Sequence, residues 1–230
     1  MRKSAGVIAV IAALALVASA AWGAVRHYQA KASEFDPAKT RLVQGAWIAG
    51  IGCPTNAKTS FGTYTDPACT TGARDNHVRG LLLAKTGPLQ NAASALARIS
   101  GVKGLTLTEL GYDIRKPGTA ADDRGSHCGA GAPRFNVRTA DGSLYFIGCN
   151  SPPGDPTPGD GWLRLRWGGS APLMAYGPGG LEDIAGKTVK SITIVFDEGQ
   201  DTGPDNFGMA VLDNIDINGT LIGHSGVASG

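Results

Sequence analysis

One carboxylate near the end of the chain, Asp213, occupies a position where a charge is costly. It falls in phase with alternating apolar residues of the stretch GMAVLDNIDING, and alternate residues of a strand share one face. An ionised carboxylate on an apolar face destabilises the fold unless it is paired or bound to a cation. The apolar residues in phase with it are Met209, Val211, Ile215 and Ile217.

Three explanations for Asp213 stay open from the sequence. It could bind Ca²⁺, a hard cation that takes carboxylate and carbonyl oxygens. It could pair with an arginine such as Arg134 or Arg166, or it could accept backbone N–H bonds at the rim of a β-sandwich. A one-residue bulge near Leu212 would instead turn Asp213 away from the apolar face.

A second group of carboxylates lies in the segment FDEGQDTGPDNFG (196–208). Its oxygen ligands are dense enough for a calcium loop, but the spacing is not that of an EF-hand. The alternative, which we favour, is a solvated hairpin loop. The candidate metal ligands are Asp197, Asp201 and Asp205, together with Asp213.

The segment WLRLRW (162–167) predicts a candidate binding surface. Trp162, Arg164 and Arg166 alternate with apolar residues, and Tyr145 of SLYFIG could join them. Aromatic faces and planar guanidinium groups suit stacking on sugar rings and binding of acidic groups. In the alternative interpretation, which we favour, tryptophans close the edge of a sandwich and the arginines lie on its surface.

Signatures of catalysis are missing from the sequence. It contains no G-x-S-x-G or H-E-x-x-H motif, and GAGAP lacks the features of a phosphate-binding loop. A polysaccharide hydrolase would need two carboxylates facing each other across a cleft. The conceivable partners, which nothing in the sequence pairs, are Glu109, Asp113, Asp197 and Glu198.

Four cysteines, Cys53, Cys69, Cys128 and Cys149, occur without a C-x-x-C motif, which argues against a zinc site. An even number in an exported chain indicates disulfides. Of the three pairings, we favour the two local ones, Cys53–Cys69 and Cys128–Cys149, with free buried thiols as the alternative. The second would close a loop of about twenty residues and contribute roughly 3 kcal/mol.

The N-terminus has the layout of a secretory signal peptide over residues 1–23, with two basic residues, an apolar run and small residues near its end. The alternative is an uncleaved anchor. Either predicts a secreted protein or one held at the outer surface of a membrane. We expect a linker over 24–40 and one domain over 41–230.

Charge excludes one class of partner. The net charge of the chain is +2, and the part after the leader carries 19 basic and 19 acidic residues. Because no basic stripe is left to neutralise phosphates, the composition argues against nucleic-acid binding. The remaining partners to consider are glycans and other extracellular ligands.

These residues must be positioned by short strands. The run 93–101 is ambiguous between strand and helix, and GGLEDIAGK could form one helical turn. RFNVRTADGSLYFIGC predicts a hairpin with Asp141 and Gly142 at its turn. The fold class is therefore an all-β, jelly-roll-like antiparallel β-sandwich, with a barrel as the alternative. Further strands are expected at 42–52, 79–87, 104–115, 162–167, 188–199 and 208–217.

The segment VLDNIDING (211–219) resembles the closing strand of carbohydrate-binding modules and of galactose-binding-like or laminin-G-like domains. HCGAGAPRFNV (127–137) is similar to segments of secreted bacterial proteins. The resemblance implies the sandwich fold. In several carbohydrate-binding modules the aspartate equivalent to Asp213 helps to hold a structural calcium, which the resemblance therefore implies. Such modules often supply a second acidic ligand near the first strand, and 42–52 contains none.

We therefore expect a secreted or cell-surface binding module, with carbohydrate as the favoured ligand and no catalytic activity. A polysaccharide-acting hydrolase and a structural envelope or adhesion domain are the alternatives. Calcium is the one cofactor that the sequence suggests.

Overall fold

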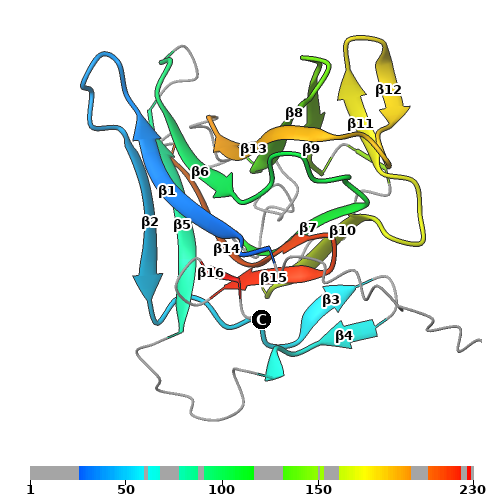
Figure 1. The fold of residues 1–230 in the computed structure, drawn as a ribbon. Helices are drawn as coiled ribbons and strands as arrows, with labels where there is room; N and C mark the ends of the chain where they lie inside the picture. Colours follow the sequence, from blue (N-terminus) through cyan, green and yellow to red (C-terminus); the bar gives the residue numbers. More distant parts are fainter. Residues whose placement is uncertain are drawn as a thin grey trace, which may run out of the picture.

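The computed structural model describes residues 26–59, 62–67, 78–87, 91–116, 132–149, 151–152, 161–197, 207–223 and 227–228. Within these residues the chain forms β-strands and no α-helix (Figure 1). None of the described segments is a helix long and apolar enough to span a membrane. The predicted signal peptide, residues 1–23, lies outside the described residues.

The strands form one hydrogen-bonded ladder that folds into two facing layers. Neighbouring strands are antiparallel, except that β3 pairs with β10 in parallel. The first sheet has the order β12 (Gly180–Asp183), β11 (Met174–Gly177), β9 (Leu144–Ile147), β8 (Arg134–Thr139), β13 (Val189–Phe196), β6 (Ser94–Ser100) and β1 (Gln29–Phe35).

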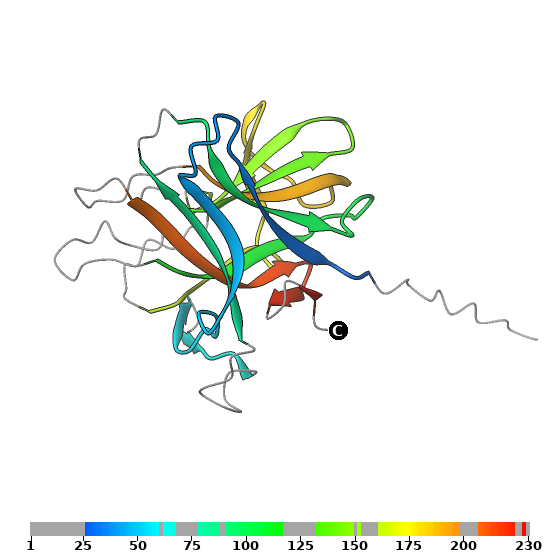
Figure 2. The ribbon, with the colours of Figure 1, turned by 90° about the vertical axis from the view of Figure 1, so that its left-hand side faces the viewer.

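The second sheet has the order β2 (Val43–Ala49), β5 (Arg79–Thr86), β14 (Phe207–Ile217), β7 (Glu109–Arg115), β10 (Leu163–Gly168), β3 (Ala57–Thr59) and β4 (Gly62–Tyr64). Strands β15 (Thr220–Gly223) and β16 (Val227–Ala228) connect β14 to β1 at one edge. In Figure 2 the side of the sandwich that carries β1 and β2 faces the viewer. The predicted fold class, an all-β antiparallel sandwich, is confirmed.

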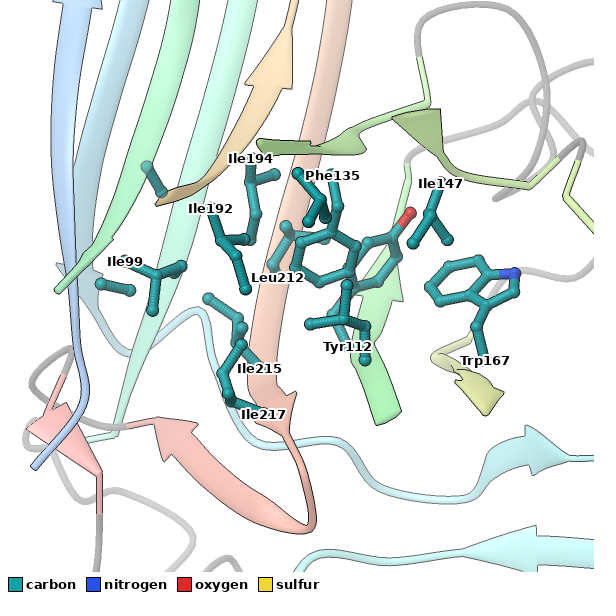
Figure 3. Packing of buried hydrophobic residues seen from close by; sticks show 14 of the residues in the cluster. Ile99, Tyr112, Phe135, Ile147, Trp167, Ile192, Ile194, Leu212, Ile215 and Ile217 are labelled. Carbon is teal, nitrogen blue, oxygen red and sulfur yellow. The ribbon is translucent and has the colours of Figure 1, made fainter. Parts of the chain in front are cut away.

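The core lies between the inner faces of the two sheets (Figure 3). Its centre is aromatic: the rings of Tyr112 and Phe135 are 5.4 Å apart, and those of Tyr112 and Trp167 are also 5.4 Å apart. The polar atoms of these rings are satisfied, because the Tyr112 hydroxyl donates to the carbonyl of Pro133 (2.7 Å) and Trp167 Nε1 donates to that of Ser151 (3.1 Å). The aromatic residues therefore fill the core without burying an unpaired donor.

Most predicted strands are confirmed, including the hairpin of β8 and β9 around Asp141 and Gly142. The ambiguous run 93–101 is strand β6. Two expectations are wrong. GGLEDIAGK is not helical, because residues 180–183 form β12, and the predicted linker over 24–40 contains β1, which pairs with β6 over its whole length. The inward residues of β1 are alanines, and their weak apolar signal explains the error.

Both cysteines that the structure describes, Cys53 and Cys149, are disulfide-bonded, and neither is a free thiol. Their predicted partners, Cys69 and Cys128, lie outside the described residues. The pairing therefore stays a prediction.

Candidate functional site

A bulge in β14 answers the question that Asp213 raises. Opposite β7, Asp213 pairs with Asp113 and Asp216 pairs with Gly111, so β14 has one residue more than its partner. Asn214 sits in this bulge with φ of 44°, a left-handed conformation that asparagine tolerates better than most residues. The extra residue reverses the alternation of side chains.

Because of this reversal, Leu212 and Ile215 both face the core, as Figure 3 shows, while Asp213 faces away from it. The prediction that Asp213 shares a face with Ile215 and Ile217 is therefore wrong. The bulge that we considered near Leu212 exists, but it begins after Asp213.

Asp213 is fully buried even though it points away from the core. Its Oδ2 accepts the N–H of Cys53 (2.9 Å) and its Oδ1 accepts that of Asn214 (2.8 Å). A Cβ atom added to Gly52 or to Gly223 would lie 2.8 Å from one of these oxygens, so two glycines leave the space for the carboxylate. The contacts correspond to the third explanation, acceptance of backbone N–H bonds. Calcium binding stays a prediction.

The other candidate metal ligands are not gathered with Asp213. Asp197 lies at the end of β13 in the first sheet, and Asp201 and Asp205 lie outside the described residues. Among the described residues, no group of three or more His, Cys, Asp and Glu side chains is placed to hold a metal ion.

A cluster of charged groups surrounds the bulge on the outer face of the second sheet. Arg166 Nε lies 3.0 Å from Asp216 Oδ2, and Arg166 Nη1 lies 3.5 Å from Asp113 Oδ1. The amide of Asn214 donates to Asp113 Oδ2 (3.0 Å) and also to Asp66 Oδ2 (3.0 Å). We call this set the covered charge cluster. It consists of Asp66, Asp113, Arg164, Arg166, Asn214 and Asp216.

Burial governs the electrostatics of the covered charge cluster. It raises the pKa of the Asp113 carboxyl, against the opposing effect of the guanidinium groups of Arg166 and Arg164. Burial also lowers the pKa of Arg166, although the nearby carboxylates oppose this shift. Next to the cluster, burial and then the charge of Asp216 raise the pKa of Glu109.

Gly111 makes this arrangement possible. A Cβ atom at Gly111 would lie 2.9 Å from Nε of Arg166 and would also overlap its Cδ. The guanidinium of Arg166 can therefore cross β7 to reach Asp216 on β14 only because residue 111 has no side chain.

The β3–β4 hairpin, which lies beside β10 in Figure 1, and the segment that donates the Cys53 N–H to Asp213 close over this face. The guanidinium of Arg164 stacks 3.6 Å from the centroid of Tyr64 on β4. Trp162 is only 5% exposed and packs with Ala57 and Val211. The arginines of WLRLRW thus belong to a largely enclosed network, in which their side chains are 17 and 18% exposed. The indole of Trp162 closes the edge of this network.

The predicted binding surface of Trp162, Arg164, Arg166 and Tyr145 is therefore not an open surface. Tyr145 lies in the main core, where it is opposite Val137 in the β8–β9 hairpin. The carboxylates considered for hydrolysis are not assembled either: Asp113 is fully buried, Asp197 belongs to the other sheet, and Glu198 lies outside the described residues.

The first sheet presents a different outer face, which we call the open face. Strand register places one residue from each of its seven strands in a single row across the sheet. With strands about 4.8 Å apart, the row is roughly 29 Å long. From β1 to β12 it consists of Lys31, Arg98, Thr193, Asn136, Phe146, Tyr176 and Leu181.

One end of this row is apolar and exposed. Phe146, Tyr176 and Leu181 are cross-strand neighbours on β9, β11 and β12, with exposed fractions of 37, 43 and 42%. Figure 1 shows β11 and β12 as a hairpin at one end of the sandwich. The middle of the row is polar, and Asn136 Oδ1 is buried there without a hydrogen-bond partner.

A hollow of about 660 Å³ adjoins the row on the open face. Phe35, Asn91 and Ser94 line one part, and Arg134 and Asp197 line another. The Arg134 guanidinium donates to both carboxylate oxygens of Asp197 (2.7 and 2.5 Å), and these bonds lower the pKa of Asp197. The same guanidinium lies 5.7 Å from the ring of Phe146, so the hollow is continuous with the row.

Sequence analysis missed the residues of the open face, although one signal was available. Once Phe135 and Val137 are assigned to the core, the Asp141–Gly142 turn pairs them with Ile147 and Tyr145, and Phe146 must then point outward. The contribution of Tyr176 could not be found in this way, because the strands β11 and β12 were not predicted.

No protein-family model and no curated protein matches the sequence. Among solved structures, the chain is similar to a family 11 carbohydrate-binding module of a cellulosomal cellulase of Clostridium thermocellum, with 13% identity, a TM-score of 0.39 and coverage of 82% of this chain and 86% of that one. A family 11 module from the same organism, in complex with a β-1,3-1,4-mixed-linked tetrasaccharide, gives 14% identity and a TM-score of 0.39 over 86% of this chain and 99% of that one.

A β-1,2-glucanase from Parabacteroides distasonis is 15% identical with a TM-score of 0.35, over 83% of this chain and 22% of the glucanase. Similarities at this level leave the function to be argued from the chain's own residues.

Proposed function

We propose that this protein is a non-catalytic β-sandwich module that binds a glycan on its open face. The observation that carries the proposal is the exposed row of Phe146, Tyr176 and Leu181 on three neighbouring strands. Contiguous exposed apolar side chains on a soluble protein mark an interaction site.

The chemistry of the row fits a sugar polymer. A pyranose ring has an apolar face that stacks on Phe146 or Tyr176, and a hydroxyl rim that needs polar partners. Thr193 and Asn136 supply such groups at the next two positions of the row.

Shape supports the same function. A row that crosses seven strands of a rigid sheet offers a long, preformed surface on which an extended chain can lie without ordering a loop. We place the protein outside the cell, either secreted or held at a membrane surface, because of its leader-like N-terminus and its two disulfide-bonded cysteines.

A binding screen with matched variants tests the proposal. We expect the wild-type protein to be retarded by polysaccharides in affinity electrophoresis, and Tyr176→Ala to weaken this binding about tenfold, equivalent to ~1.4 kcal/mol. Arg79→Ala, at an exposed position of β5 in the second sheet, should bind as the wild type does. All variants should keep the wild-type Tm, because the altered side chains are exposed.

Two results would overturn the proposal. Absence of binding to every neutral and acidic polysaccharide tested would favour a structural or adhesion domain. Release of reducing sugar from any of these polymers by the wild-type protein would show a hydrolase.

A further inference from the structure

We infer that the open face selects acidic glycans, with charged sugars over β1 and β6 and an uncharged sugar on Phe146 and Tyr176. This inference rests on the proposed function and names its ligand class. The cationic end of the row carries it: Lys31 and Arg98 are exposed cross-strand neighbours on β1 and β6.

The surroundings of these two cations are also basic. The outward positions of β8 add Arg134 and Arg138, on the same face as Asn136. On the outward positions of β1, β6, β13 and β8, Asp197 is the one carboxylate within the described residues, and it is already bonded to Arg134. Among the described residues, Lys31, Arg98 and Arg138 therefore have no carboxylate opposite them.

Guanidinium and ammonium groups at this spacing suit anionic sugar substituents. A guanidinium binds a carboxylate or a sulfate ester through two parallel N–H bonds, and a lysine adds a point charge. Arg98 and Lys31 are on adjacent strands about 4.8 Å apart, so they can hold one anionic group together. Because both side chains are exposed and flexible, the contribution depends on salt.

The other half of the row rejects a uniformly charged polymer. Asp183 lies two residues beyond Leu181 on β12, on the same face of the strand and exposed. A polynucleotide, which carries a charge at every unit, would bring phosphates close to this carboxylate. A glycan that contains both acidic and neutral sugars matches the polarity of the row from Lys31 to Leu181.

Two matched pairs of polymers with charged and neutral units test the inference: partly methyl-esterified pectin against its carboxyl-reduced form, and sparsely sulfated dextran against dextran. We expect the wild-type protein to prefer the acidic member of at least one pair by about tenfold at low salt. The pair that shows the preference distinguishes carboxylates from sulfate esters.

Variants assign the preference to the row. Lys31→Met combined with Arg98→Met should abolish the preference, so that the acidic and the neutral member bind equally, whereas Tyr176→Ala should weaken binding to both members. Arg79→Met, an exposed arginine of the second sheet, is the matched charge control and should retain the preference.

Each remaining outcome contradicts a defined claim. Equal binding of the acidic and neutral members overturns the inference but leaves the proposed function intact. Equal binding of single-stranded DNA and the acidic glycan would show general attraction of polyanions and also overturns it. Binding to none of the polymers overturns the proposed function itself.

Discussion

The two outer faces of the sandwich carry the same residue types and use them for opposite purposes. On the second sheet, Arg164 and Arg166 are enclosed with carboxylates and an aromatic ring beneath the β3–β4 hairpin. On the first sheet, Arg98 and Tyr176 lie in the open. Burial and the presence of partners, rather than residue type, therefore distinguish charged groups that stabilise the fold from those that a ligand can reach.

Removal of the enclosed cation Arg166 should have the largest effect on stability and tests this difference between the two faces most severely. Arg166→Met leaves Asp113 and Asp216 without their shared partner, and breaking a buried ion pair in this way costs about 3–5 kcal/mol. Urea unfolding should show this loss as a lower midpoint with an unchanged slope. Arg98→Met on the open face should change stability by less than about 0.5 kcal/mol. Equal losses in the two variants would contradict the distinction between the faces.

A smaller loss of stability is expected from substitution of Gly111, where the side chain of Arg166 passes close to the backbone of β7. Gly111→Ala places a Cβ atom against the Arg166 side chain and 2.5 Å from the carbonyl oxygen of Leu165. Overpacking of this kind costs about 1–3 kcal/mol, and thermal unfolding would measure it. Gly161→Ala, where a Cβ atom would meet nothing within 4 Å, is the matched control and should not lower the Tm. A Gly111→Ala protein as stable as the wild type would show that Arg166 has room to move.

The smallest expected change in stability concerns Glu109, whose pKa is raised by burial and by the charge of Asp216. A raised pKa means that the folded state binds the proton more tightly, so this group lowers stability as pH rises above about 4.3, the ordinary pKa of glutamate. Glu109→Gln should therefore match the wild type below that pH and exceed it at neutral pH. The gain should stay under about 1 kcal/mol, since solvent screens this partly exposed group.

Melting curves of the two proteins between pH 3 and pH 8 measure this difference. A Glu109→Gln protein that is less stable than the wild type at neutral pH would contradict the assignment.

The sequence predicted the fold better than the site because the two depend on different information. Strands such as β10 and β13 show clean alternation, and the physical origin of that pattern is local. The arrangement of Asp213 depends on a bulge at Asn214, which the alternation does not reveal. It also depends on Gly52 and Cys53, which are distant from it in sequence. Alternation assigned Trp162 to an outward face correctly, but it could not reveal that β3 and β4 cover that face.

The open face was missed for a related reason. Its residues come from seven strands, and only the register between strands aligns them. Tyr176 and Leu181 belong to two short strands with weak patterns, and Lys31 belongs to a segment that resembled a linker. A site assembled across a sheet therefore leaves almost no trace in any one stretch of sequence.

The extra residue at Asn214 means that the number of residues in β14 must stay odd or stay even for its side chains to keep their sides of the sheet. Loss or gain of one residue between Leu212 and Asp216 would turn each later side chain of β14 to the opposite face of the sheet. Ile215 would then lie among the carboxylates, and Asp216 would lie in the hydrophobic core. A change of two residues would keep each side chain on its own side. Natural variation in this strand should therefore preserve odd or even length more strictly than it preserves length itself.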